Sequence, residues 1–429
     1  MHPMKEMIQK RQQGINAGIP SYCTASELVL EVVLERAAKT GIPTLIEATA
    51  NQVNQFGGYT GMLPDDFYAF VLKIAERVGC KEELIILAGD HLGPLTWVNE
   101  CEADAMAKSK ELVYQYAKAG FTKIHLDTSM KVADDDKDAM LETEVIARRG
   151  AILYKATIAG YEELLKVKPE AVRPVFVIGS EVPIPGGAQE EEEGISVTKP
   201  EAFADTVDTY KKVFAEEGIS EAWEDVIGVV VQPGVEFGDA QVFMYDSEEA
   251  TDLCAKLKDY PEIVFEGHST DYQSKECLKA MVEDGIAILK VGPALTFGLR
   301  EALFALSRIE DELIAEDRSN LIAVLEDVMM ANPGNWQKHY HGTDAEQAIA
   351  RKYSFSDRSR YYMGQPEVVA TMNKMFANLG TVEIPLTMIH QYMPLQYNAV
   401  RDGALANDAR ELAKSGVVVF VEDYEYATM

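Results

Sequence analysis

The chain has 429 residues, of which 47% are hydrophobic and 26% are charged. This composition is typical of a soluble protein with a large core and excludes a disordered or fibrous chain. Lys and Arg number 40 against 70 Asp and Glu, so the formal net charge is −30. This charge argues against nucleic acid or an anionic membrane as a partner, and an anionic ligand would need local cations.

The expected strands and helices alternate along the first three quarters of the chain. The helical segments carry apolar residues at positions i, i+3 and i+4. Eight βα units without a long linker predict an α/β fold, a closed (β/α)8 TIM barrel. A doubly wound open sheet is the alternative, but the first βα turn lacks the GxGxxG pattern of dinucleotide-binding sheets. The expected strands are 18–23, 43–49, 84–91, 123–129, 174–182, 226–234, 262–270 and 286–292.

The last part of the chain has a different character. Beyond about residue 315, helical patterns are separated by Pro-rich and aromatic-rich pieces. We therefore expect residues 1–315 to form the TIM barrel and residues 316–429 to form a helical extension packed on it.

Cysteine content and hydrophobicity indicate the compartment. The five cysteines include no CxxC pair, so they predict neither a disulfide framework nor a cysteine-type zinc site. The sequence begins without the apolar segment of a signal peptide, and no stretch approaches 18 uninterrupted apolar residues. We expect a cytoplasmic protein without a membrane span.

Polar side chains gather at the carboxyl ends of the expected strands. Alternate residues of a barrel strand face the helices, and these should be apolar. In 123–129, Ile124 and Leu126 must face the helices, which turns His125 and Asp127 toward the barrel axis. A purely structural barrel would place Val, Ile and Leu there. The same alternation turns inward Glu47, Lys123, Glu181, Gln232, Glu266, His268 and Lys290.

Two histidines at strand ends are candidate metal ligands. His91 and His268 suit Zn²⁺, Mn²⁺ or Co²⁺, and Glu181 and Gln232 are the next candidates. Either histidine alone would more often satisfy a buried hydrogen bond, but two of them beside acidic residues favour a metal site. Asp90 and Glu181 are candidate catalytic groups that exchange a proton with a substrate hydroxyl. Asp90 would otherwise cap a helix or support a ligand.

Two inward-facing lysines raise a different chemistry. A desolvated lysine can form a Schiff base with a ketose, and Lys123 and Lys290 are candidates. Acidic residues nearby favour ion pairs instead. We expect His125 to be a hydrogen-bonded core residue.

Loops after the last two expected strands commonly bind phosphate in barrel enzymes, with small residues beside a helix amino terminus. An arginine of the extension, Arg358, would bind a second anionic group or lie at the surface. Asp127 is a further candidate substrate contact. The candidate phosphate contacts in the two loops are Ser269, Thr270, Gly292 and Ala294.

Several long motifs resemble one family. They include AGDHLGP (88–94), VVVQPGVEFG (229–238), EGHSTDYQ (266–273) and YSFSDRSRYY (353–362), and they resemble the GatZ/KbaZ family. Members of this family are the larger subunits associated with class II D-tagatose-1,6-bisphosphate aldolase. The resemblance implies a TIM barrel in galactitol, N-acetylgalactosamine or tagatose catabolism. It also implies a non-catalytic partner that supports the activity and stability of a smaller catalytic subunit. A homo-oligomer is expected by the same analogy.

The barrel is also similar to that of class II aldolases, which hold zinc with three histidines. Gly89-Asp90-His91 and Gly267-His268-Ser269 resemble two of their segments, but Gln232 stands where a third histidine is expected. An amide oxygen is a weaker zinc ligand than imidazole. The substitution argues against full aldolase activity, but the polar groups that remain suit chemistry, and members similar to this family are associated with ketose 4-epimerisation. The alternative function is a stand-alone, metal-dependent 4-epimerase of fructose and tagatose or their 6-phosphates. In that reaction Asp90 would remove the C4 hydroxyl proton, the C3–C4 bond would break, and rebonding on the opposite aldehyde face would invert C4.

Overall fold

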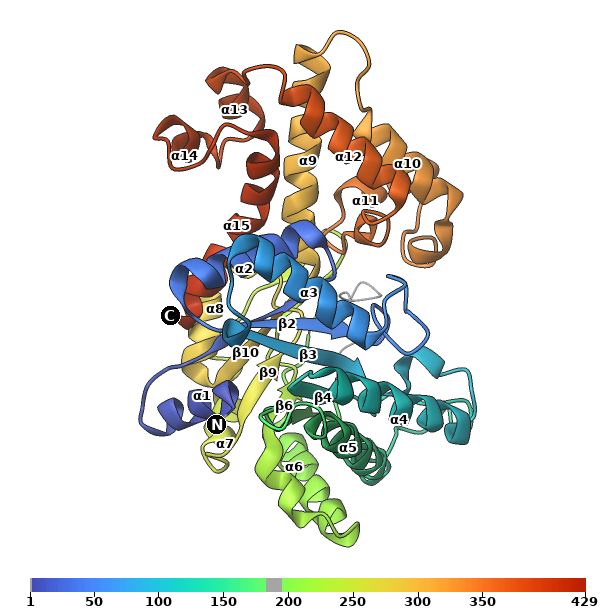
Figure 1. Cartoon of the computed structure of the whole chain (residues 1–429). Helices are drawn as coiled ribbons and strands as arrows, with labels where there is room; N and C mark the ends of the chain where they lie inside the picture. Colours follow the sequence, from blue (N-terminus) through green and yellow to red (C-terminus); the bar gives the residue numbers. More distant parts are fainter. Residues whose placement is uncertain (1, 183–194) are drawn as a thin grey trace.

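The computed structural model describes residues 2–182 and 195–429, and its centre is a closed barrel of parallel strands (Figure 1). The strands follow one another around the barrel in the order β1-β10-β9-β6-β5-β4-β3-β2, so that β1 pairs with both β2 and β10. The predicted TIM barrel is confirmed. Its strands are β1 (Ile19–Cys23), β2 (Thr44–Thr49), β3 (Ile85–Leu92), β4 (Lys123–Leu126), β5 (Val175–Ile178), β6 (Val226–Val231), β9 (Val264–Gly267) and β10 (Ile286–Val291).

Helices of the barrel region follow the strands. Their ends agree with local signals: α3, for example, has Pro64 at its first position and is capped after Val78 by Gly79, whose φ is 72°. A small hairpin, β7 (Glu236–Phe237) and β8 (Val242–Phe243), lies in the loop after β6. The helices are α2 (Glu27–Thr40), α3 (Pro64–Val78), α4 (Glu102–Ala119), α5 (Thr143–Leu165), α6 (Pro200–Glu216), α7 (Thr251–Leu257), α8 (Lys275–Asp284) and α9 (Pro293–Leu313).

The barrel interior is apolar toward the amino-terminal ends of the strands and polar toward their carboxyl ends. Helix α1 (Pro3–Gln12) places Met4, Met7 and Ile8 in one core cluster with apolar residues of the strands. The carboxyl ends carry the polar side chains instead. Several strands also end earlier than the sequence predicts; β4 stops at Leu126 and β6 at Val231. The polar residues beyond these points leave the strand ladder and form loops.

The C-terminal helices form an extension above the barrel, and long α9 runs from one into the other (Figure 1). The last helix returns to the barrel, where it packs against α2, α8 and α9. Its Tyr424 hydroxyl donates to the Thr270 carbonyl at 2.8 Å. Residue 315 lies between α9 and the next helix. The extension contains α10 (Leu321–Ala331), α11 (Asp344–Tyr353), α12 (Pro366–Leu379), α13 (Leu386–Tyr392), α14 (Tyr397–Arg401) and α15 (Ala409–Thr428).

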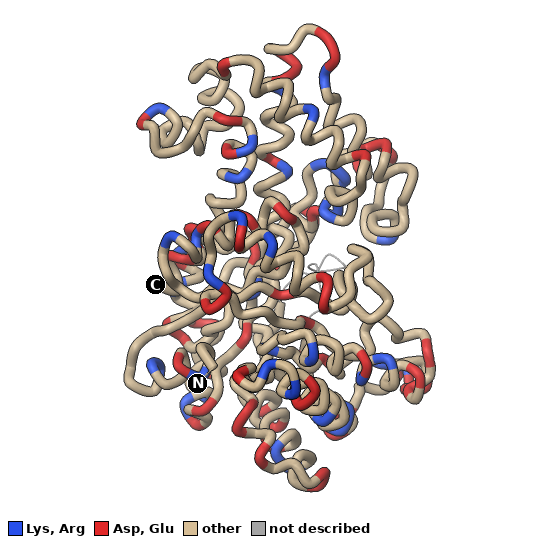
Figure 2. Tube along the Cα trace, in the orientation of Figure 1, with Lys and Arg blue, Asp and Glu red and all other residues tan. Residues whose placement is uncertain are grey.

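Charged residues of both signs are interspersed along the chain (Figure 2). The excess of acidic residues is therefore spread over many elements. Within the described residues, no helix is long and apolar enough to cross a membrane.

Candidate active site

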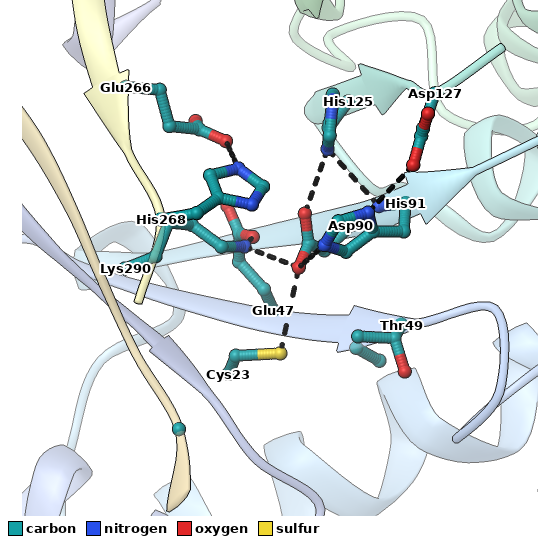
Figure 3. A network of polar contacts seen from close by, with 12 residues as sticks. Cys23, Glu47, Thr49, Asp90, His91, His125, Asp127, Glu266, His268 and Lys290 are labelled. Atoms are coloured by element: carbon teal, nitrogen blue, oxygen red, sulfur yellow. Dashed lines mark hydrogen bonds and ion pairs between the residues drawn. The ribbon is translucent and has the colours of Figure 1, made fainter. Parts of the chain in front are cut away.

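A cluster of one carboxylate and three imidazoles lies at the carboxyl ends of β3, β4 and β9 (Figure 3). Asp90, His91, His125 and His268 are all buried, and one ligand atom from each lies within 4.8 Å of the others. The ring centroids of His91 and His268 are 4.9 Å apart. The His125 ring lies 5.1 Å from His91 and 5.2 Å from His268. Barrel closure thus brings together three rings that are distant in sequence.

The end of β3 turns two consecutive side chains into this cluster. Neighbouring residues of a regular strand point to opposite sides. His91 has a φ of 47°, in a left-handed region that is uncommon for residues other than glycine and is concentrated at functional sites. The pairing of β3 with β4 also shifts register between Gly89 and Leu92. This irregularity allows Asp90 and His91 to face the same cavity.

Each of the three imidazoles has a carboxylate partner, and His125 Nδ1 lies 2.9 Å from Asp90 Oδ1. His91 Nδ1 lies 2.7 Å from Asp127 Oδ2, which leaves Nε2, 3.7 Å from Asp90 Oδ2, as its ligand atom. His268 Nε2 lies 2.9 Å from Glu266 Oε1 and leaves Nδ1 as its ligand atom. Such pairs orient metal-binding histidines and select their tautomer. In the described part of the chain, the buried His125 Nε2 has no hydrogen-bond partner. Because a buried polar atom without a partner is unfavourable, the donor set fits a divalent metal.

The electrostatic surroundings shift the pKa values of His91 and His268 in opposite directions. Burial lowers the pKa of His91, but the carboxylates of Asp90 and Asp127 more than offset this and leave it raised. Burial lowers the pKa of His268 to about 4, so its ring is neutral at pH 7 and keeps a lone pair. Burial raises the pKa of Asp127, but the His91 ring brings it down to about 2.

Buried ion pairs connect the cluster to charged residues inside the barrel. Lys123 Nζ lies 2.7 Å from Glu47 and 2.6 Å from Glu266. Lys290 Nζ lies 2.7 Å from Asp90 Oδ2 and also pairs with Glu47. Burial lowers the pKa of Lys290, but Asp90 and Glu47 hold it well above its usual value. A Schiff base needs the uncharged amine, so both lysines instead serve to neutralise the buried acids.

Two adjoining cavities open from the cluster toward the extension. The first, of about 110 Å³, is lined by Asp90, His91 and His268 and also by Arg360. The second, of about 560 Å³, lies between the loop after β1 and the extension, and Arg360 lines it too. Arg360 therefore stands where the two spaces meet.

Within the described residues, Arg360 has hydrogen bonds but no counter-ion. Its guanidinium donates to the carbonyl of Ser356, to that of Asp357 at 3.1 Å and to the Tyr361 hydroxyl at 2.9 Å. Among the described residues, no carboxylate forms an ion pair with it. Since a guanidinium is always protonated and matches carboxylate and phosphate geometry, this position suits the anionic group of a ligand.

Two residues that the sequence predicts for the site lie elsewhere. Glu181 is exposed and accepts a hydrogen bond from Thr198 at 2.9 Å. The Gln232 side-chain oxygen accepts from the backbone N–H groups of Gly234 and Val235 at 2.9 and 3.0 Å. Its oxygen is therefore engaged within its own loop. His125 joins the cluster instead, and its inward position in β4 was the sequence signal for it.

The predicted phosphate contacts are also mostly engaged. Thr270 Oγ1 donates to the Lys290 carbonyl at 2.7 Å, and the backbone N–H groups of Gly292 and Ala294 donate to Asp271. Ser269 lines the smaller cavity. Arg358 is buried and donates to the Asn335 carbonyl at 3.2 Å. Arg360, and not Arg358, is the arginine of this turn that reaches the cavities.

Comparison with known proteins places the chain in a family. The model of the family described as D-tagatose-1,6-bisphosphate aldolase subunit GatZ/KbaZ-like matches residues 4–429. The chain belongs to the GatZ/KbaZ-like family. The resemblance seen in the sequence motifs is thereby confirmed.

Similar proteins match nearly the whole chain, as the GatZ/KbaZ-like family model does. The D-tagatose-1,6-bisphosphate aldolase subunits GatZ of Salmonella heidelberg and Salmonella typhimurium are each 47% identical over 403 residues, which is 94% of this chain and 93% of theirs. A crystal structure of a probable tagatose 6 phosphate kinase from Sinorhizobium meliloti is 44% identical. It covers 96% of this chain and 100% of its own, with a TM-score of 0.86.

Proposed function

We propose that this GatZ/KbaZ-like chain is a subunit of a class II D-tagatose-1,6-bisphosphate aldolase. It would support the activity and stability of a smaller catalytic subunit in galactitol, N-acetylgalactosamine or tagatose catabolism. The observation that carries this proposal is the family match over residues 4–429, together with relatives of nearly equal length that bear this subunit's name. The cavity chemistry is consistent with a sugar-phosphate ligand.

A divalent metal is the cofactor that the cluster would hold. His91, His125 and His268 would supply imidazole ligands beside Asp90, and Zn²⁺, Mn²⁺ and Co²⁺ all suit this set. When bound, such an ion polarises the oxygens of a ketose and stabilises negative charge that develops on them.

Asp90 is the group best placed to exchange a proton with the sugar. It lines the smaller cavity, and Lys290 and His125 hold its two oxygens at 2.7 and 2.9 Å. Burial raises the pKa of Asp90, but His91 and Lys290 keep it well below the usual value. An ionised carboxylate is thus available to accept a hydroxyl proton. Arg360, which lines the same cavity, would bind the phosphate of a ketohexose phosphate.

Two other activities receive less support. None of the relatives reported above is named an epimerase, so the 4-epimerase reaction is not favoured. The Sinorhizobium meliloti protein is named a probable kinase. The present sequence contains no Gly-Lys pair, so the P-loop form of nucleotide binding is excluded for it.

Reconstitution tests the subunit role. A class II D-tagatose-1,6-bisphosphate aldolase catalytic subunit from the same organism is assayed alone, with this chain, and with the heat-denatured chain. We expect the folded chain alone to co-elute with the catalytic subunit, to raise its aldolase activity and to lengthen its half-life on heating. Equal activity and half-life in all three samples would refute the proposal.

Metal analysis tests the cluster separately. After equilibration with Zn²⁺, Mn²⁺ or Co²⁺ and gel filtration, we expect about one ion per wild-type chain by elemental analysis. His91→Ala and His268→Ala should each lose it, whereas His390→Ala, at an exposed position of α13, should retain it. Full occupancy in both cluster variants would show that these histidines are not the ligands.

A further inference from the structure

The amino terminus of α9 lies beside the smaller cavity, where phosphate groups commonly bind in barrel enzymes. Asp271 Oδ1 accepts the N–H of Gly292 at 3.0 Å and the N–H of Ala294 at 2.8 Å. Pro293 has no N–H to offer, and the N–H of Leu295 donates to the Gly292 carbonyl at 3.1 Å. The backbone donors that would hold a phosphate at this helix end are therefore already engaged.

The loop that carries Asp271 is held in place by the extension. The Tyr424 hydroxyl of α15 lies 2.9 Å from Thr270 Oγ1 and donates to the Thr270 carbonyl. Thr270 Oγ1 in turn donates to the Lys290 carbonyl of β10. The hydroxyl nearest to the helix end is thus also engaged within the protein. Asp271 is only 2% exposed, yet it lines the cavity.

Two charged groups that line the smaller cavity consequently differ in what they offer a ligand. Arg360, which has no ion-pair partner among the described residues, lines both cavities. At the start of α9, the Asp271 carboxylate fills the position of an anion. A ligand phosphate brought there would meet this carboxylate and would find the N–H groups of Gly292 and Ala294 already engaged.

We propose that Asp271 is a specificity-determining residue, a built-in anion that fills the α9 anion site and excludes a ligand phosphate from that end of the cavity. The inference rests on the proposed sugar-phosphate site and adds a rule to it. An anionic group of the ligand is accepted at Arg360 and rejected at Gly292 and Ala294. A residue that merely caps α9 would affect stability without controlling which anions bind.

Calorimetric titration of the full-length chain at pH 7.5 tests this rule. The probes are inorganic phosphate, fructose 6-phosphate and fructose 1,6-bisphosphate. We expect the wild type to bind the bisphosphate no more tightly than the monophosphate. Asp271→Ala frees two N–H donors, and we expect it to bind inorganic phosphate and the bisphosphate at least about tenfold more tightly than the wild type does.

Two further variants keep the test decisive. Asp271→Asn retains an oxygen acceptor for both N–H groups but removes the charge, so it should fold even where Asp271→Ala does not and should tighten bisphosphate binding. Asp408→Ala removes an exposed carboxylate that caps α15 through the N–H groups of Arg410 and Glu411. It should change the melting temperature without any gain in phosphate binding.

Three results would overturn the inference. They are tighter binding of the bisphosphate than of the monophosphate by the wild type, unchanged phosphate affinity in folded Asp271→Ala, and unchanged bisphosphate affinity in Asp271→Asn. If the wild type binds neither sugar phosphate, the affinities of the wild type and of Asp271→Ala for inorganic phosphate decide the question. None of these results depends on reconstitution with a catalytic subunit, so the two proposals fail separately.

Discussion

Cations inside the barrel and the cation on the extension are held in contrasting ways. Lys123 and Lys290 each contact two buried carboxylates, whereas Arg360 contacts carbonyls and a hydroxyl. Buried charges are tolerated when they are paired. The barrel lysines are therefore part of the folded framework, and the charge of Arg360 remains available for a ligand.

The acids show the same contrast. Asp90 is surrounded by an ammonium and imidazoles, while Asp271 is held by neutral N–H groups. Burial accordingly raises the pKa of Asp271 to about 6, and the pKa of Asp90 is depressed. Neighbouring charge thus decides which acid stays ionised across a wide pH range.

Removing a paired lysine should have the largest effect. Lys123→Met leaves Glu47 and Glu266 without a shared cation, and we expect the free energy of unfolding to fall by about 3–5 kcal/mol. Urea denaturation measures it. The matched control is Lys155→Met, which breaks an exposed pair with Glu217 and should cost about 1 kcal/mol or less. Equal losses of unfolding free energy in the two variants would mean that the buried pairs stabilise the fold no more than an exposed pair does.

The raised pKa of Asp271 predicts a pH effect of about 3 kcal/mol, from a shift of roughly two units. Between about pH 4 and 6 the unfolded chain releases a proton that the native chain keeps. The free energy of unfolding should therefore fall as pH rises through this window, relative to that of Asp271→Asn. Denaturation of both proteins at pH 4, 5, 6 and 7 measures the difference. Parallel curves would contradict the raised pKa.

Neutralising the unpaired cation should weaken ligand binding without a large loss of stability. For Arg360→Met we expect the Kd of fructose 6-phosphate to rise by about 10–100-fold, because a charge-assisted hydrogen bond is lost. Titration calorimetry measures the Kd. Arg401→Met, which breaks an exposed pair with Asp402, should leave it unchanged. An unaltered Kd in Arg360→Met would place the anion contact elsewhere.

Loss of the carboxylate behind His91 should weaken metal binding to a degree comparable with the effect of Arg360→Met on ligand binding. Asp127→Asn removes the charge that orients the His91 ring, and we expect metal affinity to drop by about 10–100-fold. Competition with a chelator at pH 7 measures the metal affinity. Asp402→Asn, at the surface, serves as the reference. Equal affinities in the two variants would show that Asp127 does not support a metal ligand.

The sequence by itself determined the barrel and much of its interior. Alternation of apolar residues is a local property of each strand, so it correctly predicted eight strands and the inward positions of Lys123, Glu266 and His268. It also predicted the inward position of His125, but it gave no reason to group His125 with His91, because closeness between β3, β4 and β9 exists only in the closed barrel. The family motifs added the expectation of a sugar-phosphate enzyme subunit.

Only the tertiary structure decided how the site is completed. The left-handed backbone of His91 overrides strand alternation, and Gln232 turns its amide oxygen to its own loop. The short turn Arg358–Tyr361 brings Arg360 to the cavities and leaves Arg358 against the Asn335 carbonyl. Asp271 reaches the start of α9 only because β9 and β10 are neighbours. Each of these outcomes depends on contacts between distant segments, which local residue patterns do not encode.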